Sequence, residues 1–268
     1  MSTPLDGDEP SRLLKTAATT LDVLDALKET GGTTAAELAE RLDLSETTTY
    51  NQLTTLREHE FVVKDGTEYR LSGKHLLFGE QVRQGNALYQ HGREELEEIA
   101  AQTGEYAQLV IEQFGRGIIV YETRGDDAIG EAFQARLQQE AFDLHYTAAG
   151  KAILAHLPDA RVGEIIADHG LTGRTAQTIT DRDRLREELA EIRERGYAFN
   201  DEEQVEGLRV VGAPIRGPEG EVLGALSVSG PTSRMQDERY HEELPRLVTK
   251  TANLIEVNIN MARRSEPA

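Results

Sequence analysis

The chain has 268 residues, with 48 acidic and 29 basic side chains, a formal net charge of −19 and a pI near 4.8. It has no cysteine, which excludes disulfides, cysteine-ligated metals and a cysteine nucleophile. No apolar run approaches the roughly 18 residues of a membrane span, and the polar, acidic residues 1–10 lack the features of a signal peptide, so we expect a cytoplasmic protein without membrane contacts.

The N-terminal region begins with a polar tail and two helical patterns. Residues 1–11 are predicted to be disordered, and apolar residues at helical spacing over 13–27 predict a first helix that ends at Gly31. Thr34 stands three residues before Glu37, which is the spacing of a capping box and marks the start of a second helix.

A third helix and a hairpin follow. Ser45 is a favourable N-cap for a helix that runs to about His59. Two β-prone runs, 61–64 and 67–71, are separated by Asp65-Gly66, which is a strong hairpin signal. Three helices followed by a hairpin make a winged helix.

The rest of the chain mixes helical and β-prone segments. Helices are expected over 74–102 (one or two, with a break or bend near Gly85 and Gly92), 147–157, 159–169, 181–195 and 236–262. Strands are expected over 106–113, 117–123, 142–146, 208–216 and 222–229. This succession indicates an α+β sensor domain around an antiparallel sheet.

These segments predict an α+β chain with two functional parts. The predicted divisions are a disordered tail at 1–11, a winged helix-turn-helix DNA-binding domain at 12–73 with its helix-turn-helix at about 34–53, linker helices at 74–102 that lead into the effector domain, and an effector-binding domain at 74–264.

The third helix has the chemistry of a DNA-reading helix. In a helix-turn-helix this helix enters the major groove, and its N-terminal residues reach base edges. Hydroxyls can bond bases or phosphates, threonine methyl groups can touch thymine, and Asn or Gln can bond adenine. The predicted DNA-binding residues are Thr34, Ser45, Glu46, Thr47, Thr48, Tyr50, Asn51 and Gln52, with Lys64 and Arg70 of the wing.

Charge leaves an alternative open. There is no Lys or Arg between Leu42 and Leu56, although phosphate contacts normally supply much of the affinity for DNA. Basic contacts are therefore expected from the flanks: Arg12, Lys15, Arg57, Lys64, Arg70, Lys74 and His75. The alternative is a winged helix that binds protein.

The acidic excess also suggests an environment. Only six of the 29 basic residues are Lys, Trp is absent, and aromatic residues make up 5% of the chain. This composition is typical of a halophilic proteome, because molar salt screens repulsion within about 3 Å and negative charge maintains solubility. An ordinary acidic protein of a mesophile is the alternative.

Three long motifs follow one another in the C-terminal half. They are LHYTAAGKAILAHLP at 144–158, RGYAFNDEEQVEGLR at 195–209 and ALSVSGPTSR at 225–234. In sequence, order and spacing they resemble the motifs of IclR-family transcriptional regulators, and with the winged helix the resemblance covers roughly residues 12–262. It implies a winged helix-turn-helix, a linker helix and a GAF-like effector domain, in a dimer or tetramer that represses or activates operons, commonly for catabolism of sugars, organic acids or aromatics.

The resemblance further implies a ligand pocket between the sheet and its covering helices. The pocket residues carried over by motif are Ala148, Ala149, Gly150, Asn200, Val210, Ser227 and Ser229. Gly150 at a helix start is expected to leave backbone N–H groups free for an anion. Ser227 and Ser229 stand two apart on a strand, so both hydroxyls face one side and can fix a carboxylate or a sugar hydroxyl.

One departure from the family pattern limits what the resemblance implies. A relative that binds a small ketoacid has Asp and Cys where this chain has Asn200 and Val210, so that ligand is not transferred. The alternative role for Ser227 and Ser229 is to satisfy backbone groups within the sheet.

Other classes of function have less support. The chain has no nucleophile elbow, P-loop, Gly-x-Gly-x-x-Gly or His-Glu-x-x-His motif, and its seven His lack metal-ligand spacing. We therefore expect no enzyme activity, no metal and no cofactor. The remaining alternative is an assembly or signalling protein whose GAF-like domain binds no ligand.

The sequence thus predicts a DNA-binding regulator that acts as a homodimer or homotetramer on double-stranded DNA. A small-molecule effector would change its DNA affinity by binding two domain arrangements unequally.

Overall fold

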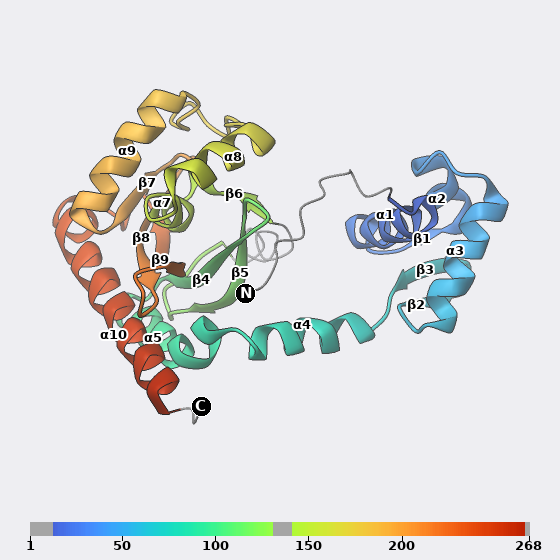
Figure 1. Ribbon diagram of the computed structural model, residues 1–268, viewed down its shortest axis with the longest axis horizontal. Helices are drawn as coiled ribbons and strands as arrows, with labels where there is room; N and C mark the ends of the chain where they lie inside the picture. Colours follow the sequence, from blue (N-terminus) through green and yellow to red (C-terminus); the bar gives the residue numbers. More distant parts are fainter. Residues whose placement is uncertain (1–12, 131–140, 266–268) are drawn as a thin grey trace, which may run out of the picture. The chain divides into compact units, whose positions relative to one another are not determined.

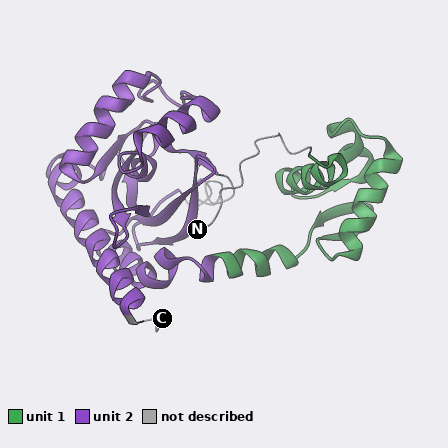
Figure 2. Cartoon of the chain, viewed as in Figure 1, with its two compact units in different colours: residues 1–82 green, residues 83–268 purple. Residues whose placement is uncertain are grey.

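The computed structural model describes residues 13–130 and 141–265, so the predicted tail at 1–11 lies outside the described residues. The chain forms two compact units, 1–82 and 83–268 (Figure 2). The division falls inside helix α4 (Lys74–Gln84). None of the helices in the described ranges combines the length and apolarity needed to cross a membrane.

The first unit is a helix-turn-helix followed by a hairpin. Its elements are α1 (Lys15–Thr30), β1 (Thr33–Thr34), α2 (Ala35–Arg41), α3 (Glu46–Glu58), β2 (Val62–Asp65) and β3 (Glu68–Leu71), with most of α4 (Figure 1). The strands are ordered β1-β3-β2, and neighbours are antiparallel. Sequence patterns did not predict β1, because a strand of two residues has no readable period.

Side-chain caps begin α2 and α3 as predicted. The Thr34 hydroxyl accepts the N–H of Glu37, and the Glu37 carboxylate accepts the N–H of Thr34 at 2.9 Å. The Ser45 hydroxyl accepts the N–H of Thr48 at 3.1 Å. Each cap satisfies amides that the first helical turn leaves without partners. A small core then joins the elements through Val23, Leu27, Leu38, Leu53, Leu56, Val62 and Tyr69.

The second unit is built on one antiparallel sheet. Its strands are β4 (Tyr106–Gln113), β5 (Arg116–Arg124), β6 (Phe142–Asp143), β7 (Ala198–Asp201), β8 (Leu208–Arg216) and β9 (Val222–Pro231), in the order β6-β5-β4-β9-β8-β7. Its helices are α5 (Ala87–Thr103), α7 (Ala148–Leu154), α8 (Asp159–His169), α9 (Arg182–Arg195) and α10 (Leu244–Ser265), with a 3-10 turn at Leu144–Tyr146 and a π turn at Arg239–Glu243.

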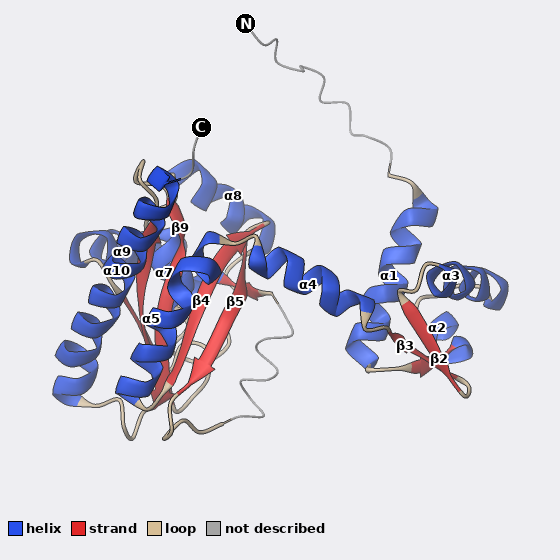
Figure 3. Ribbon diagram, turned by 90° about the horizontal axis from the view of Figure 1, so that it is seen from below, coloured by secondary structure: helices blue, strands red, loops and turns tan. Residues whose placement is uncertain are grey.

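Helices cover both faces of this sheet. On one face α5 and α10 lie side by side and pack on Leu109 and Leu226 (Figure 3). On the other face α7 packs on the next residues along the strands, Val110 and Ala225. This alternation is the period of two expected of a strand buried on both faces. The predicted α+β class with an antiparallel sheet is confirmed.

Two local predictions needed correction. The strand expected over 142–146 ends at Asp143, because the next three residues form a 3-10 turn. Gly92 does not interrupt a helix; a Cβ there would lie 3.1 Å from Ile255 Cδ1, so glycine permits close contact between α5 and α10. The break lies before Asn86, whose side chain caps α5 by accepting the N–H of Leu88.

Candidate DNA interface and ligand pocket

The outer face of α3 is polar and exposed. Thr47, Tyr50 and Asn51 lie on it as predicted, and Tyr50 is 55% exposed. Ser45 and Glu46 are exposed at the start of the helix. Thr54 extends the same face and was not predicted, although its spacing of seven residues from Thr47 identifies it.

Gln52 does not belong to this face. It is only 7% exposed, and its Oε1 accepts a hydrogen bond from the Thr20 hydroxyl of α1 at 2.6 Å. Thr49, Leu53 and Leu56 share its buried side. Gln52 therefore joins α3 to α1, which corrects its predicted place on the DNA-reading surface.

Two other predicted residues are held at helix starts, Thr34 as the cap of α2 and Thr48 against Ser45, the cap of α3. The Thr34 hydroxyl lies 2.8 Å from Glu37 Oε2 in the capping box, and Thr48 lies half-buried with its hydroxyl 2.8 Å from that of Ser45. Their hydroxyls already have protein partners.

The wing supplies the nearby cations. The Lys64 ammonium lies 5.1 Å from the centre of the Tyr69 ring, an arrangement that holds the cation by its attraction to the ring face. Arg70 forms an ion pair with Asp65 across the hairpin. Both basic side chains are exposed, but part of the Arg70 charge is offset inside the wing.

A small pocket lies between the start of α7 and the sheet. Its volume is about 20 Å³, which is room for a single water. Five predicted residues line it, namely Ala148, Ala149, Val210, Ser227 and Ser229. The others are Gln108, Ile119, Phe142, Thr147, Gln204 and Leu208, which sequence reasoning missed. We call this the α7 pocket.

Gly150 and Asn200 have scaffold roles outside the pocket lining. The Gly150 N–H donates to the Thr147 hydroxyl at 3.0 Å. The prediction that this N–H is free to bind an anion was therefore wrong. A Cβ at Gly150 would lie 2.1 Å from the Leu144 carbonyl oxygen. Asn200 donates to the Tyr146 carbonyl and accepts from the Glu203 N–H, both at 2.9 Å.

Strand register brings the polar lining residues together. Ser227 of β9 lies opposite Gln108 of β4, and Ser229 lies opposite Val210 of β8. The Ser229 hydroxyl oxygen is buried and has no hydrogen-bond partner among the described residues. Because buried polar atoms are normally paired, this hydroxyl is available to a bound group.

The first turn of α7, which lines the pocket, has backbone amides that its cap does not reach. Thr147 caps only the third amide of α7, so the N–H groups of Ala148 and Ala149 have no partner in the described part of the chain. None of the described residues that line the α7 pocket carries a formal charge. The pocket therefore offers hydroxyls and amide donors, which suit a hydroxyl or a carboxylate.

A buried ion pair lies behind the pocket. Lys151 of α7 donates to Glu203 Oε1 at 2.5 Å and lies 3.6 Å from Glu188 Oε1. Lys151 is 2% exposed. Burial raises the pKa of the Glu203 carboxyl, and the Lys151 charge offsets part of that rise. Glu203 directly precedes the pocket residue Gln204, so the pair connects two walls of the pocket.

Protein-family models match both units. The IclR helix-turn-helix domain matches residues 16–66, and the bacterial transcriptional regulator IclR C-terminal domain matches residues 81–257.

Within the described residues, no three His, Asp or Glu side chains lie close enough to hold a metal.

Similar proteins give the same assignment. The chain is 38% identical over 255 residues to the "Probable HTH-type transcriptional regulator ArcR" of Halobacterium salinarum, covering 95% of this chain and 97% of that protein. The crystal structure of the Thermotoga maritima IclR superposes with a TM-score of 0.72 and 27% identity, covering 91% of this chain and 98% of that one.

A third similarity shows the fold alone. An IclR homologue of Microbacterium hydrocarbonoxydans, crystallised in complex with 4-hydroxybenzoate, is 21% identical, with a TM-score of 0.77 over 93% of this chain and all of that one. Together, the matches to both units and the close relative establish the family. The chain belongs to the IclR family of transcriptional regulators, with a helix-turn-helix DNA-binding domain and an IclR-type C-terminal domain.

Proposed function

We propose that this regulator controls a catabolic operon in the cytoplasm in response to a small metabolite bound in the α7 pocket. The effector is a sugar, an organic acid or an aromatic compound. The observation that carries the proposal is the buried, unpartnered hydroxyl of Ser229 beside the Ala148 and Ala149 amides.

The size of the pocket supports a ligand-coupled change. About 20 Å³ is too small for any metabolite, so an effector has to move the lining residues apart. Gln204 lies in the segment between β7 and β8, Leu208 begins β8, and Ala148 begins α7. A ligand that separates these walls binds the widened arrangement better and thereby favours it.

An aromatic carboxylate is a suitable first probe. The IclR homologue that holds 4-hydroxybenzoate shares this fold. In the present chain a carboxylate could accept from the two α7 amides and from a serine hydroxyl. Ile119, Phe142 and Val210 would surround an apolar ring.

The test combines ligand screening with a paired variant. A thermal-shift screen of 4-hydroxybenzoate, sugars and central organic acids identifies a hit, and isothermal titration measures its affinity. Ser227→Ala/Ser229→Ala should weaken binding by about tenfold or more, since hydrogen bonds to charged groups contribute about 1.5–3 kcal/mol. Exposed Ser233→Ala is the control. Wild-type affinity in the double variant contradicts the pocket assignment, and a flat screen favours the ligand-free assembly alternative.

The exposed apolar surface of the first unit supports a homodimer. α4 contains no buried residue, and Leu76 and Val82 on it are 76% and 66% exposed. Leu13, Leu14 and Leu21, in and just before α1, are also exposed. We infer that a second copy covers these side chains, because large exposed apolar surfaces mark interaction sites.

Pairing of two DNA-binding units predicts a near-palindromic operator. Light scattering should give at least twice the chain mass of 29.7 kDa, and Leu76→Ser/Val82→Ser should shift the mass toward one chain. A monomeric wild type, or footprinting of one unpaired half-site, contradicts this assembly.

A further inference from the structure

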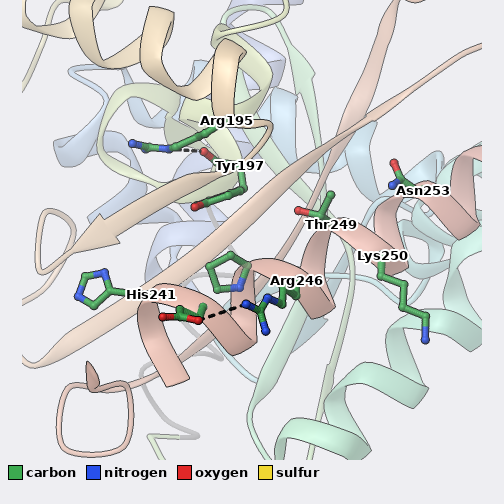
Figure 4. A pocket seen from close by; sticks show the side chains of 9 residues that line it. Arg195, Tyr197, His241, Arg246, Thr249, Lys250 and Asn253 are labelled. Atoms are coloured by element: carbon green, nitrogen blue, oxygen red, sulfur yellow. Dashed lines mark hydrogen bonds and ion pairs between the residues drawn. The ribbon is translucent and has the colours of Figure 1, made fainter. Parts of the chain in front are cut away.

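The second unit has a second cavity, apart from the α7 pocket. It is a groove of about 660 Å³ between the end of α9 and the first turns of α10, and it shares no lining residue with the α7 pocket. Its lining is Arg195, Tyr197, His241, Glu242, Pro245, Arg246, Thr249, Lys250 and Asn253 (Figure 4). We call it the α10 groove. Its volume is within the range of small-molecule sites.

The charge of the groove is opposite to that of the protein. The chain has a net charge of −19, yet the described residues that line the groove include three cations, His241 and one carboxylate. α10 as a whole carries four basic residues and one acidic residue. A local positive region on an acidic protein attracts small anions selectively.

One wall of the groove is held rigid. The Arg195 guanidinium donates to the Tyr197 carbonyl at 2.7 Å and lies above the Tyr197 ring, with 5.6 Å to its centre. Glu188, at 2.9 Å, and Glu191, at 3.6 Å, offset part of its charge. Arg195 and Tyr197 therefore form a fixed surface.

The other wall supplies the adaptable cations. Arg246, Lys250 and Asn253 lie on successive turns of the same face of α10. Arg246 has only an exposed partner, Glu242 at 3.2 Å, and Lys250 has no ion pair among the described residues. Exposed pairs of this kind contribute little and exchange readily. A guanidinium, an ammonium and an amide in a row suit phosphate oxygens.

Two irregular features lie in the same place. The turn that carries His241 and Glu242 is π-helical and ends two residues before Pro245, which has no N–H to continue the helical ladder. Turns of this kind occur frequently at functional sites. At the groove, the Thr249 hydroxyl oxygen is buried and has no partner in the described ranges.

We propose that the α10 groove binds a small phosphorylated anion, with Arg246 and Lys250 at the phosphate and Tyr197 and Asn253 along the rest of the molecule. This site is separate from the α7 pocket and gives the regulator a second input. The two sources of such an anion are free phosphate and an organic phosphate monoester.

Isothermal titration of the full chain with glycerol 3-phosphate and with inorganic phosphate tests the proposal. It is done at the lowest KCl concentration that keeps the protein folded by circular dichroism, because salt screens the attraction. We expect saturable binding, and Arg246→Gln/Lys250→Gln should weaken it by about tenfold or more. Tighter binding of glycerol 3-phosphate identifies an ester site, whereas equal binding identifies a phosphate site.

The control is Arg263→Gln/Arg264→Gln at the far end of α10. It removes the same charge from the same helix, and Arg263 resembles Arg246 in having one exposed partner, Glu221 at 3.3 Å. This control should keep affinity within about twofold, because Arg263 and Arg264 lie several helical turns from the groove and the attraction between exposed charges falls with distance and with screening by salt. No saturable binding, an equal loss in the control, or loss of binding in Ser227→Ala/Ser229→Ala overturns the proposal. Loss of binding in Ser227→Ala/Ser229→Ala would indicate that the anion binds in the α7 pocket instead.

Discussion

The Lys151 ammonium and the Glu203 carboxylate form a contact of 2.5 Å between α7 and the segment that follows β7, and both side chains are buried. The same segment is held by the Thr175 and Thr178 hydroxyls, which donate to the Glu203 carbonyl at 3.3 and 2.7 Å. The pair therefore ties two walls of the α7 pocket together, and a ligand that moves α7 away has to offset the cost of separating buried charges.

Lys151→Met should destabilise the fold by about 3–5 kcal/mol, because it leaves the Glu203 carboxylate buried without a cation. The double variant Lys151→Met/Glu203→Gln should lose clearly less stability than Lys151→Met, because it leaves no isolated buried charge. Urea unfolding of the wild type, both single variants and the double variant measures the coupling. If the losses of the two single variants simply add, the pair does not act as a unit.

Asn51→Ala should lower affinity for the operator by about 1–3 kcal/mol, which is the usual value of a bidentate contact to a base. Gln52→Ala should instead reduce the free energy of unfolding by about 1 kcal/mol, because its partner is Thr20. Fluorescence anisotropy with the protein's own promoter region, at one fixed salt concentration, measures the DNA affinity of both variants and so separates a DNA contact from a contact that stabilises the fold. A larger loss of DNA affinity in Gln52→Ala than in Asn51→Ala contradicts the assigned reading face.

The first unit was predictable where signals are local. Thr34 and Ser45 predict the starts of α2 and α3, and Asp65-Gly66 predicts the hairpin. Gln52 was wrongly assigned to the DNA-reading face because its side chain is polar. It lies next to Leu53 on the buried side of α3.

The pocket was predictable only in part. Ser227 and Ser229 share a face because successive side chains of a strand point to opposite faces, so their spacing of two residues was enough to predict it. Gln108 reaches them through the pairing of β4 with β9, about half the chain apart, and no local pattern encodes that register. Gly150 and Asn200 lie in the motifs, but backbone packing and capping explain their identities.

Acid should destabilise the second unit below about pH 6.5. Burial lowers the pKa of His145 and of His156 below the ordinary 6.5. Because the folded-state pKa is depressed, the unfolded chain binds more protons in this range. Stability is therefore complete above pH 6.5 and is lost as the pH falls toward the folded-state values.

His156→Gln isolates this effect, because it removes one titrating group while the amide can still donate to the Ala152 carbonyl that His156 contacts at 2.9 Å. Urea unfolding at pH 7.5 and pH 5.5 should show a smaller loss on acidification in the variant than in the wild type. An equal loss would mean that His156 does not contribute.

Salt should stabilise the protein. With a net charge of −19, repulsion between acidic side chains opposes the compact state at low ionic strength, and molar KCl reduces the Debye length to about 3 Å. Glu94 and Glu98 stand four residues apart on exposed positions of α5, where like charges repel. Glu94→Gln/Glu98→Gln should raise stability by about 0.2–0.5 kcal/mol in low salt and have little effect in molar KCl. Melting curves of both proteins in rising KCl measure this. If the melting temperature of the wild type does not rise, repulsion is not what limits its stability, and the halophilic interpretation of the composition fails with it.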